Sequence, residues 1–205
     1  MTSDDDRSGH NRTVAHGDPI APAGFPEMID AMRDLQDRIT AAAPPAGVVA
    51  QATATLTALS ACLDRFRLLE SEQITGRLTD LPGRAQTMIP VVHVGSADDN
   101  NFSGSVTYGR FYLGGNGAVH GGAVSLLFDD VLGRLATAGS HPYSRTAYLH
   151  VDYRSITPVE RELRIEARLE RVEGRKRYVR GTLSDGDRLC AEADGLFVTL
   201  RPGQP

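Results

Sequence analysis

The sequence predicts an α+β fold, in which one long helix packs on one face of an antiparallel sheet. The first observation is a glycine-broken loop that runs into an apolar, helix-forming stretch: residues 114–133 read G-G-N-G-A-V-H-G-G-A-V-S-L-L-F-D-D-V-L-G. The second is a series of alternating apolar and polar segments after residue 144, joined by short turns. Strands joined by short turns pair antiparallel, and a helix segregated to one face of such a sheet defines the α+β class.

The composition is that of an ordinary globular protein. Of the 205 residues, 40% are hydrophobic and 23% are charged, which fits one large domain or one domain with an appendage. The formal net charge of −4, with no dominant basic face, argues against nucleic acid as a partner. Cys62 and Cys190 lie far apart without metal-ligand spacing, so we expect no disulfide framework and no metal site.

The same features predict a cytoplasmic protein. Unpaired cysteines fit a reducing compartment. No apolar run approaches the roughly 20 residues that span a bilayer, so we expect no membrane span. The N-terminus carries Asp4, Asp5 and Asp6 and lacks the basic region and apolar core of a signal peptide.

We expect three parts along the chain. Residues 1–24 are nearly devoid of apolar side chains and predict a disordered tail. Residues 25–70 carry two apolar runs at helical spacing, separated by the break Ala43–Gly47, and predict a helical hairpin. Residues 71–205 contain the predicted sheet and long helix.

The strands of this last part are predicted from their period of two. Met88–Val94 and Ser105–Leu113 precede the long helix. Thr146–Arg154 follows it and alternates, so that Ala147, Leu149, Val151 and Tyr153 are expected to face one way. Further strands are expected over residues 162–170, 177–183 and 188–200, with turns between them.

The loop and the first turn of the predicted helix have the features of an oxyanion site. Gly121 and Gly122 follow His120, and glycine lets another backbone or a ligand approach closely. The first N–H groups of a helix have no partner within it and suit a developing negative charge. Asp129 lies nine residues after His120 in an otherwise apolar run, where a carboxylate is costly unless it is paired or used. These residues indicate an enzyme site for a carbonyl substrate.

The two neighbouring carboxylates of the helix are expected to differ in role. Asp129 and Asp130 point about 100° apart on a helix. Asp130 has Arg134 four residues ahead, the spacing of an ion pair, and is interpreted as a structural charge. Asp129 shares its stripe with the small residues Ser125 and Gly133, which leave room for a ligand. Catalysis and a hydrogen-bonded structural role are both open for Asp129, and the glycines before it favour catalysis.

Other well-known catalytic motifs are absent from the sequence. It contains no H-E-x-x-H zinc motif, no G-x-S-x-G serine elbow and no phosphate loop with G-K-[ST]. The cluster Arg175-Lys176-Arg177 is typical of a solvated turn, and its alternative interpretation is a site for the phosphates of a cofactor-sized ligand.

At these residues the chain resembles the PaaI-like hotdog-fold acyl-CoA thioesterases, particularly the branch related to human thioesterase superfamily members 4 and 5. Four segments within residues 89–202 carry the resemblance: G-A-V-H-G-G-A-V-S-L-L-F-D, T-A-Y-L-H-V-D-Y-R, R-V-E-G-R-K-R-Y-V and A-E-A-D-G-L-F-V. The resemblance implies a bent antiparallel sheet wrapped around a central helix, to which this chain adds its N-terminal hairpin. It also implies a homodimer or a dimer of dimers, joined through continuous sheets, with acyl-CoA bound in a tunnel at the subunit interface.

The resemblance further implies roles for single residues. It places the thioester carbonyl near the Gly121 N–H, with His120 beside it. It assigns to Asp129 of the other subunit either the activation of water or direct attack on the carbonyl, and to the Thr146 hydroxyl the orientation of that water or carboxylate. Asn116 is displaced from the position where many relatives carry Asn or Gln. No cofactor is implied, because coenzyme A is part of the substrate. The candidates for substrate binding are Gly122, Asn116, Arg175 and Lys176.

Hydrolysis of acyl-CoA thioesters is the function that these observations favour. Hydration or dehydration of enoyl-CoA is hosted by the same fold, but it uses a different Asp/His motif that we do not find in this sequence. A non-catalytic acyl-CoA-binding or regulatory module, whose hairpin recruits a partner, is the alternative from another functional class. Release of free thiol from a panel of acyl-CoAs distinguishes the three.

Overall fold

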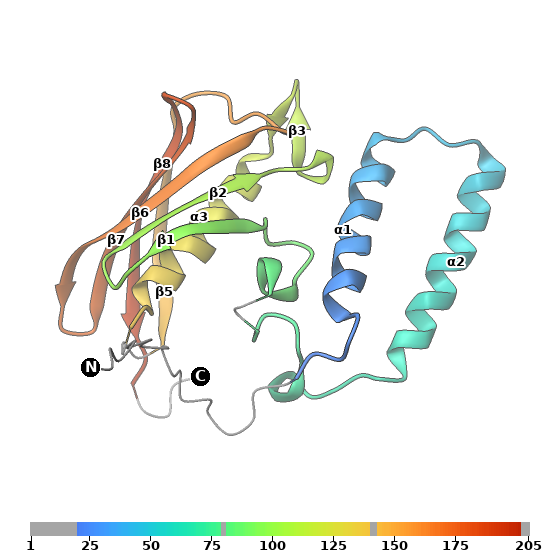
Figure 1. Cartoon of the computed structure of the whole chain (residues 1–205), viewed down its shortest axis with the longest axis horizontal. Helices are drawn as coiled ribbons and strands as arrows, with labels where there is room; N and C mark the ends of the chain where they lie inside the picture. The colour runs from blue at the N-terminus through green and yellow to red at the C-terminus, as the bar shows by residue number, and fades with distance from the viewer. Residues whose placement is uncertain (1–19, 79–80, 140–142, 202–205) are drawn as a thin grey trace, which may run out of the picture.

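The structure is a computed structural model that describes residues 20–78, 81–139 and 143–201. The disordered tail predicted for residues 1–24 therefore lies mostly outside the described residues. The described chain forms an α+β body, and a helical hairpin stands beside it (Figure 1). The predicted fold class is confirmed.

The body is built on one six-stranded antiparallel sheet with the strand order β1-β2-β6-β7-β8-β5. The helix α3, Gly121–Ala136, lies across one face and contacts β2, β5, β6, β7 and β8 (Figure 1). The strands are β1 Val92–Ala97, β2 Asn101–Thr107, β5 Ser144–Tyr153, β6 Glu162–Glu173, β7 Lys176–Asp185 and β8 Arg188–Thr199.

The core lies between α3 and the sheet. Leu127, Phe128 and Leu132 of α3 are fully buried, and each such side chain contributes about 1.5–3 kcal/mol on burial. A Cβ built on Gly181 of β7 would lie 3.0 Å from the Leu132 side chain and 3.2 Å from that of Phe128. The helix therefore rests directly on the backbone of β7, and this close seating fixes the height of α3 above the sheet.

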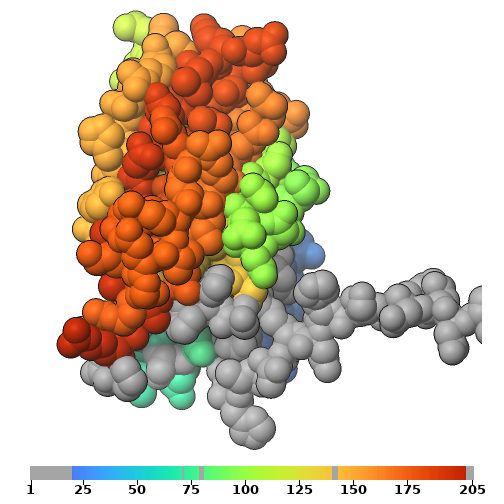
Figure 2. All heavy atoms as spheres, turned by 90° about the vertical axis from the view of Figure 1, so that its left-hand side faces the viewer, coloured from blue at the N-terminus to red at the C-terminus, as the bar shows by residue number. Residues whose placement is uncertain are grey.

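The opposite face of the sheet carries charge. Figure 2 looks onto this side of the molecule, where strands β6, β7 and β8 cover most of the described surface. Arg180 of β7 lies 2.6 Å from the Glu192 carboxylate of β8, and Arg154 lies 2.7 Å from the same side chain. These hydrogen bonds from the guanidinium groups lower the pKa of Glu192. Alternation thus separates an apolar inner face from an ionic outer face.

The predicted strands before α3 differ from the observed ones. The segment predicted from Met88 becomes a strand only at Val92, after Pro90, because proline has no N–H for a ladder. The strand predicted for Ser105–Leu113 ends at Thr107. Its remainder forms the short 3₁₀ helix η3, Arg110–Tyr112, and leads into the two-stranded ladder of β3, Leu113–Gly115, and β4, Ala118–Val119. This small ladder directly precedes the start of α3.

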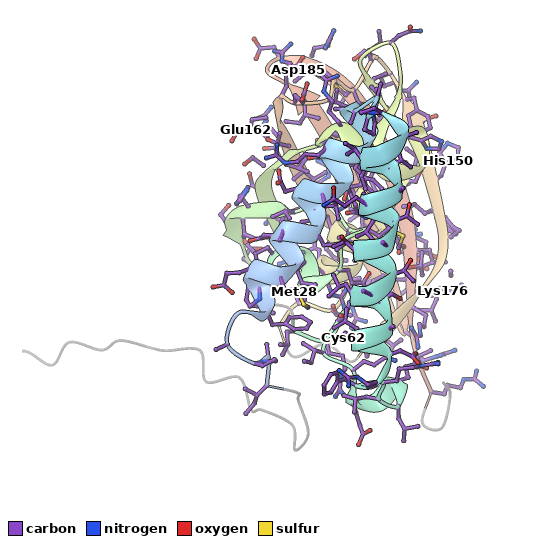
Figure 3. The ribbon with its side chains drawn as sticks, turned by 90° about the vertical axis from the view of Figure 1, so that its right-hand side faces the viewer. Met28, Cys62, His150, Glu162, Lys176 and Asp185 are labelled. Carbon is purple, nitrogen blue, oxygen red and sulfur yellow. The ribbon has the colours of Figure 1, made fainter. Side chains whose placement is uncertain are left out.

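The N-terminal hairpin consists of α1, Phe25–Ala41, and α2, Ala46–Asp64. Helix α1 lies between α2 and the α+β body, and Figure 3 shows both helices in front of the sheet with Met28 and Cys62 near the same end. Two side chains of α1 anchor it: Arg33 donates to the Ile89 carbonyl at 3.0 Å, and the Asp37 carboxylate accepts from the Phe111 N–H at 2.7 Å. The hairpin is therefore fixed to the body through α1.

Helix α2 carries few side chains that fix it to the rest of the chain. It has 19 residues, a mean hydropathy of 1.5 over its apolar window, and none of that window is buried. By length and composition it meets the requirement for a bilayer span, so the expectation that no run approaches this limit was wrong for α2. One such helix is weak evidence for a span. The absence of a span in the protein stays a prediction.

Candidate active site

The start of α3 is capped by the His120 side chain. The Gly122 N–H donates to Nδ1 of His120 at 3.0 Å. Since Nδ1 accepts this bond, the proton of a neutral imidazole is assigned to Nε2. The Gly122 N–H is thereby engaged, whereas the Gly121 N–H has no hydrogen-bond partner among the described residues. The site offers one backbone donor at Gly121 and one side-chain donor at His120.

A tyrosine from β5 holds the first turn of α3 in place. The Tyr153 hydroxyl donates to the Gly121 carbonyl at 2.8 Å and lies 2.9 Å from Oγ of Ser125. A Cβ built on Gly121 would lie 3.2 Å from the same hydroxyl. Glycine at position 121 therefore lets the tyrosine close onto the helix, and the position of the Gly121 N–H depends on this contact.

The middle of α3 presents Asp129, which is hydrogen bonded to β5. The Thr146 hydroxyl donates to Oδ1 of Asp129 at 2.7 Å. Thr146 and Tyr153 both contact α3, although they are seven positions apart in β5. In a regular strand, residues an odd number of positions apart lie on opposite faces. A β-bulge between Thr146 and Tyr148 supplies the change of face. The prediction that Ala147 shares a face with Tyr153 was therefore wrong, because the alternation is broken at the bulge.

Asp130 points into a different environment. Its side chain is 2% exposed, and it lies 2.7 Å from the Arg134 guanidinium and 3.3 Å from that of Arg84. The first contact is the predicted i,i+4 ion pair. Arg84 comes from a turn upstream of the sheet, which the sequence did not indicate as part of the site. Asp130 thus ties this turn to α3.

Asp129 lies on the wall of a pocket of about 610 Å³. The pocket extends from the middle of α3 toward its C-terminal end and is closed on one side by the start of β5. Charged and apolar side chains both contribute to it. Its lining residues include Arg84, Ile89, Leu126, Asp129, Asp130, Arg134, Arg145, Thr146 and Phe197.

Within one chain the two halves of the predicted site are separated. Asp129 lies nine residues along the helix from His120, which corresponds to about 13 Å at 1.5 Å per residue. One thioester carbonyl cannot contact both groups of the same chain. A complete site of the predicted kind therefore requires a second copy, whose helix start meets Asp129.

The predicted substrate-binding residues are scattered. Asn116 lies in the β3–β4 turn, is exposed and has a positive φ of 50°. Arg175 and Lys176 lie at the β6–β7 turn, where the Arg175 guanidinium donates to the Thr199 carbonyl at 2.7 Å. None of these three lines the Asp129 pocket. Gly122 lies at the helix start, but its N–H is bound to His120.

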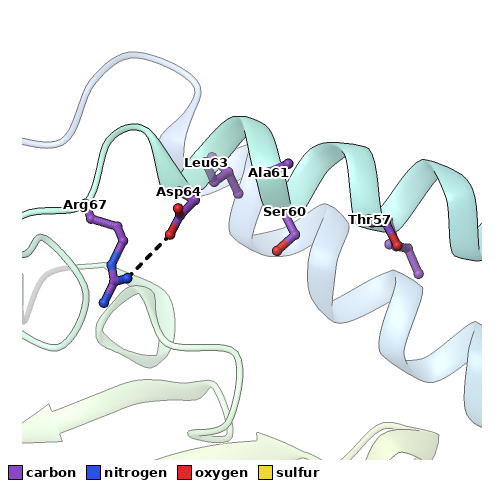
Figure 4. A pocket seen from close by; sticks show the side chains of 7 residues that line it. Thr57, Ser60, Ala61, Leu63, Asp64 and Arg67 are labelled. Carbon is purple, nitrogen blue, oxygen red and sulfur yellow. Dashed lines mark ion pairs between the residues drawn. The ribbon is translucent and has the colours of Figure 1, made fainter.

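Another hollow, of about 840 Å³, runs along the end of α2 (Figure 4). Its charged groups are Asp64 and Arg67, which form an ion pair at 3.6 Å. Within the described ranges no cluster of three His, Cys, Asp or Glu side chains is placed to hold a metal ion. Among the hollows described, the one at Asp129 therefore offers the chemistry that a carbonyl substrate requires.

Sequence reasoning missed Tyr153, Ser125 and Arg84. Ser125 stands four residues after Gly121, the spacing that brings its hydroxyl to 3.3 Å from the Gly121 carbonyl, so a signal was present. Arg84 has no local signal, since its contact with Asp130 joins residues 46 positions apart.

Comparison with known proteins shows what the α+β body is similar to. Residues 116–192 match the family model of the thioesterase superfamily, a span that contains His120, Gly121, Asp129, Thr146 and Tyr153. A solved crystal structure of a thioesterase superfamily protein is similar to 88% of this chain and 97% of its own, with 27% identity and a TM-score of 0.73. The body is similar to the thioesterase superfamily over these residues and has the hotdog fold of that solved structure, which agrees with the resemblance seen in the sequence.

Two curated relatives are mammalian proteins. Acyl-coenzyme A thioesterase THEM4 of rat is 34% identical over 91 residues, which are 43% of this chain and 39% of that protein. The mouse protein of the same name is 34% identical over 104 residues, 49% of this chain and 44% of its own. The chain spans less than half the length of these relatives. The solved structure also shares the hairpin, because the α+β body alone is too short to account for 88% of the chain.

Proposed function

We propose that the protein hydrolyses acyl-CoA thioesters to the free acid and coenzyme A. The observation that carries the proposal is the Asp129 carboxylate, oriented by Thr146 at 2.7 Å on the wall of a pocket. The names of the rat and mouse relatives, acyl-coenzyme A thioesterases, support the same reaction. No resident cofactor is proposed, since coenzyme A enters with the acyl group.

In the proposed site, Asp129 of one subunit faces His120 and Gly121 of the other. The Gly121 N–H and the Nε2–H of His120 donate to the thioester oxygen, and stabilise the negative charge that develops on it. Each such donor contributes on the order of 3 kcal/mol to the transition state. Because His120 is fixed by its bond from the Gly122 N–H, its donor is oriented before the substrate binds.

Asp129 acts on the carbonyl carbon by one of two routes. Thr146 occupies Oδ1, which leaves Oδ2 to take a proton from water as a general base, and the hydroxide then attacks the carbon. The tetrahedral intermediate expels the CoA thiolate, which recovers the proton from Asp129. Alternatively Oδ2 attacks the carbon itself and the CoA thiolate leaves. Water then hydrolyses the resulting anhydride at the Asp129 carbonyl carbon, which restores the carboxylate and supplies the proton that the thiolate takes up.

The test is release of free thiol from a panel of acyl-CoAs with C2 to C18 and aryl acyl groups. Saturable release by the wild type, abolished in Asp129→Asn, is the expected result. Binding of acyl-CoA without turnover would favour the non-catalytic module, and water addition to enoyl-CoA would favour the hydratase. A single turnover in ¹⁸O-water distinguishes the two routes, because the nucleophilic route leaves the label in Asp129.

A further inference from the structure

The pocket beyond Asp129 is cationic, which is unusual for a cavity that would hold a hydrocarbon chain. Small-molecule pockets are mostly apolar, with few polar groups that fix orientation. This one is lined by three arginines and two aspartates, so its wall carries one positive charge in excess. The arginines are Arg84, Arg134 and Arg145.

The excess charge is concentrated around Asp130. This carboxylate is 2% exposed and is shared by two guanidinium groups, at 2.7 Å from Arg134 and 3.3 Å from Arg84. Asp130 neutralises only one of them. The Nε atoms of Arg84 and Arg134 are both buried and have no hydrogen-bond partner in the part of the chain that the structure describes. The cluster therefore retains one unbalanced positive charge beside the pocket.

The backbone is strained in the turn that places Arg84 at this wall. Gly83, Arg84 and Ala85 all have left-handed conformations, with φ values of 56°, 56° and 59°. For the two residues that carry a Cβ, this conformation is unfavourable. The turn is closed by the Arg84 carbonyl, which accepts from the Gly76 N–H at 2.7 Å. Strain of this kind is concentrated at functional sites.

We propose that this end of the pocket binds an anionic group, and that the group is a carboxylate at the free end of the acyl chain. The preferred substrates are then CoA thioesters of short dicarboxylic acids. A guanidinium is suited to a carboxylate because its parallel N–H groups match the two oxygens. This inference rests on the proposed function, since it names the substrate class of that same site.

The distance along α3 favours the acyl group over the phosphates of coenzyme A. Arg134 lies five residues beyond Asp129, about 7 Å along the helix axis. A short acyl chain covers this distance from a carbonyl held at Asp129. The phosphates of coenzyme A are separated from the same carbonyl by the whole pantetheine arm.

The experiment compares thioesters of equal chain length. We expect kcat/KM to be about ten- to a hundredfold higher for succinyl-CoA than for butyryl-CoA, and for glutaryl-CoA than for pentanoyl-CoA. Arg84→Gln should reduce both ratios toward one, while Arg84→Lys should restore part of the preference. The Asp130–Arg134 pair remains in both variants, and their melting temperatures report whether they fold. Arg110→Gln is the matched control, because Arg110 pairs with Glu160 at 2.8 Å away from the pocket and should leave the ratios unchanged.

The outcomes separate the two proposals. Equal turnover of carboxylated and neutral acyl-CoAs, or ratios unaffected by Arg84→Gln, overturns the carboxylate site and leaves the hydrolase intact. The N-acetylcysteamine thioesters of the same acids carry no phosphate. If Arg84→Gln lowers kcat/KM equally for all CoA thioesters but for none of the N-acetylcysteamine thioesters, the bound anion is a phosphate and the proposal is wrong. If no thioester is hydrolysed, the hydrolase fails, and thermal stabilisation by glutarate but not by pentanoate still decides the carboxylate site.

Discussion

At the scale of the residue, two adjacent aspartates have separate functions because the helix turns them into different surroundings. Asp129 is half-buried on a pocket wall and accepts one hydrogen bond from Thr146. Asp130 is buried between two guanidinium groups. The sequence indicated this division from the i,i+4 position of Arg134 and from the small residues beside Asp129. A substitution at each position should therefore affect a different measured quantity.

Asp129→Asn should abolish most turnover while the protein stays folded. An amide neither takes a proton from water nor attacks a carbonyl, and loss of a catalytic base lowers the rate by about 10²–10⁴-fold. The Thr146 hydroxyl still has an oxygen to donate to, so the melting temperature should change little. Steady-state kinetics and thermal denaturation of one preparation check both statements. Near-wild-type kcat in a folded variant would show that Asp129 is not the reacting group.

Asp130→Asn should instead destabilise the protein. Removing one partner of a buried ion pair leaves uncompensated charge and costs about 3–5 kcal/mol, here because Arg84 and Arg134 lose their common carboxylate. For a chain of this length that corresponds to a fall in melting temperature of roughly 10 °C. Differential scanning calorimetry measures it. A loss of kcat larger than that of Asp129→Asn, in a protein of unchanged melting temperature, would reverse the two roles.

At the scale of the element, the site depends on how β5 meets α3. The bulge between Thr146 and Tyr148 turns two otherwise opposed side chains toward the helix. Thr146 then orients the carboxylate in the middle of α3, and Tyr153 fixes the Gly121 carbonyl at its start. One edge strand thereby positions both halves of the proposed chemistry.

Tyr153→Phe tests this positioning role. The ring remains, but the hydroxyl that bonds the Gly121 carbonyl and Ser125 is lost, at a net cost of about 0.5–1.5 kcal/mol per bond. We expect kcat to fall more than KM rises, because the loosened helix start no longer holds its N–H toward the transition state. Tyr148→Phe on the same strand is the control, since Tyr148 lines an unrelated hollow with Arg171 and Tyr178. Equal kinetics of the two variants would leave Tyr153 with a structural role only.

Local pattern was sufficient to predict part of this arrangement. The helix at Gly121, the four strands after it and the candidates His120, Gly121, Asp129 and Thr146 follow from glycine placement, alternation and family resemblance. The bulge in β5 and the turn at Arg84 were missed, because each is set by tertiary contacts. Alternation continues through a bulge in the sequence even though the side chains change face. Likewise, nothing near Arg84 in the chain indicates its contact with Asp130, 46 residues away.

At the scale of the whole molecule, a single chain leaves surfaces that invite a second copy. Strand β5 is an edge of the sheet, most of its residues are exposed, and they include Tyr148 and Tyr153. A long edge with apolar side chains is a template for pairing with another strand. The separation of about 13 Å between His120 and Asp129 also favours a second copy, since the start of α3 and the carboxylate at its middle each lack the other within one chain.

A dimer with shared sites makes a prediction about mixed subunits. Gly121→Val should be inactive alone, because its side chain obstructs the helix start. A Cβ at this position meets only the far end of the Tyr153 side chain, at 3.2 Å, which can move, so the variant should fold. Asp129→Asn should also be inactive alone. In a mixed dimer, however, one of the two sites combines the intact Asp129 of one chain with the intact Gly121 of the other.

Co-expression of the two variants under different affinity tags should therefore recover activity. Random pairing gives half mixed dimers with one working site of two each, which is about a quarter of the wild-type activity per chain for a two-fold symmetric assembly. The doubly tagged fraction, purified over both tags, should reach about half by the same reasoning. The control places both substitutions in one chain and co-expresses it with the wild type. Its mixed dimer should have no working site if the sites are shared in this way, whereas a complete site in each chain would leave one. A doubly tagged dimer of the single variants without activity, or an active monomer in sedimentation at micromolar concentration, would show that each chain carries a complete site of its own.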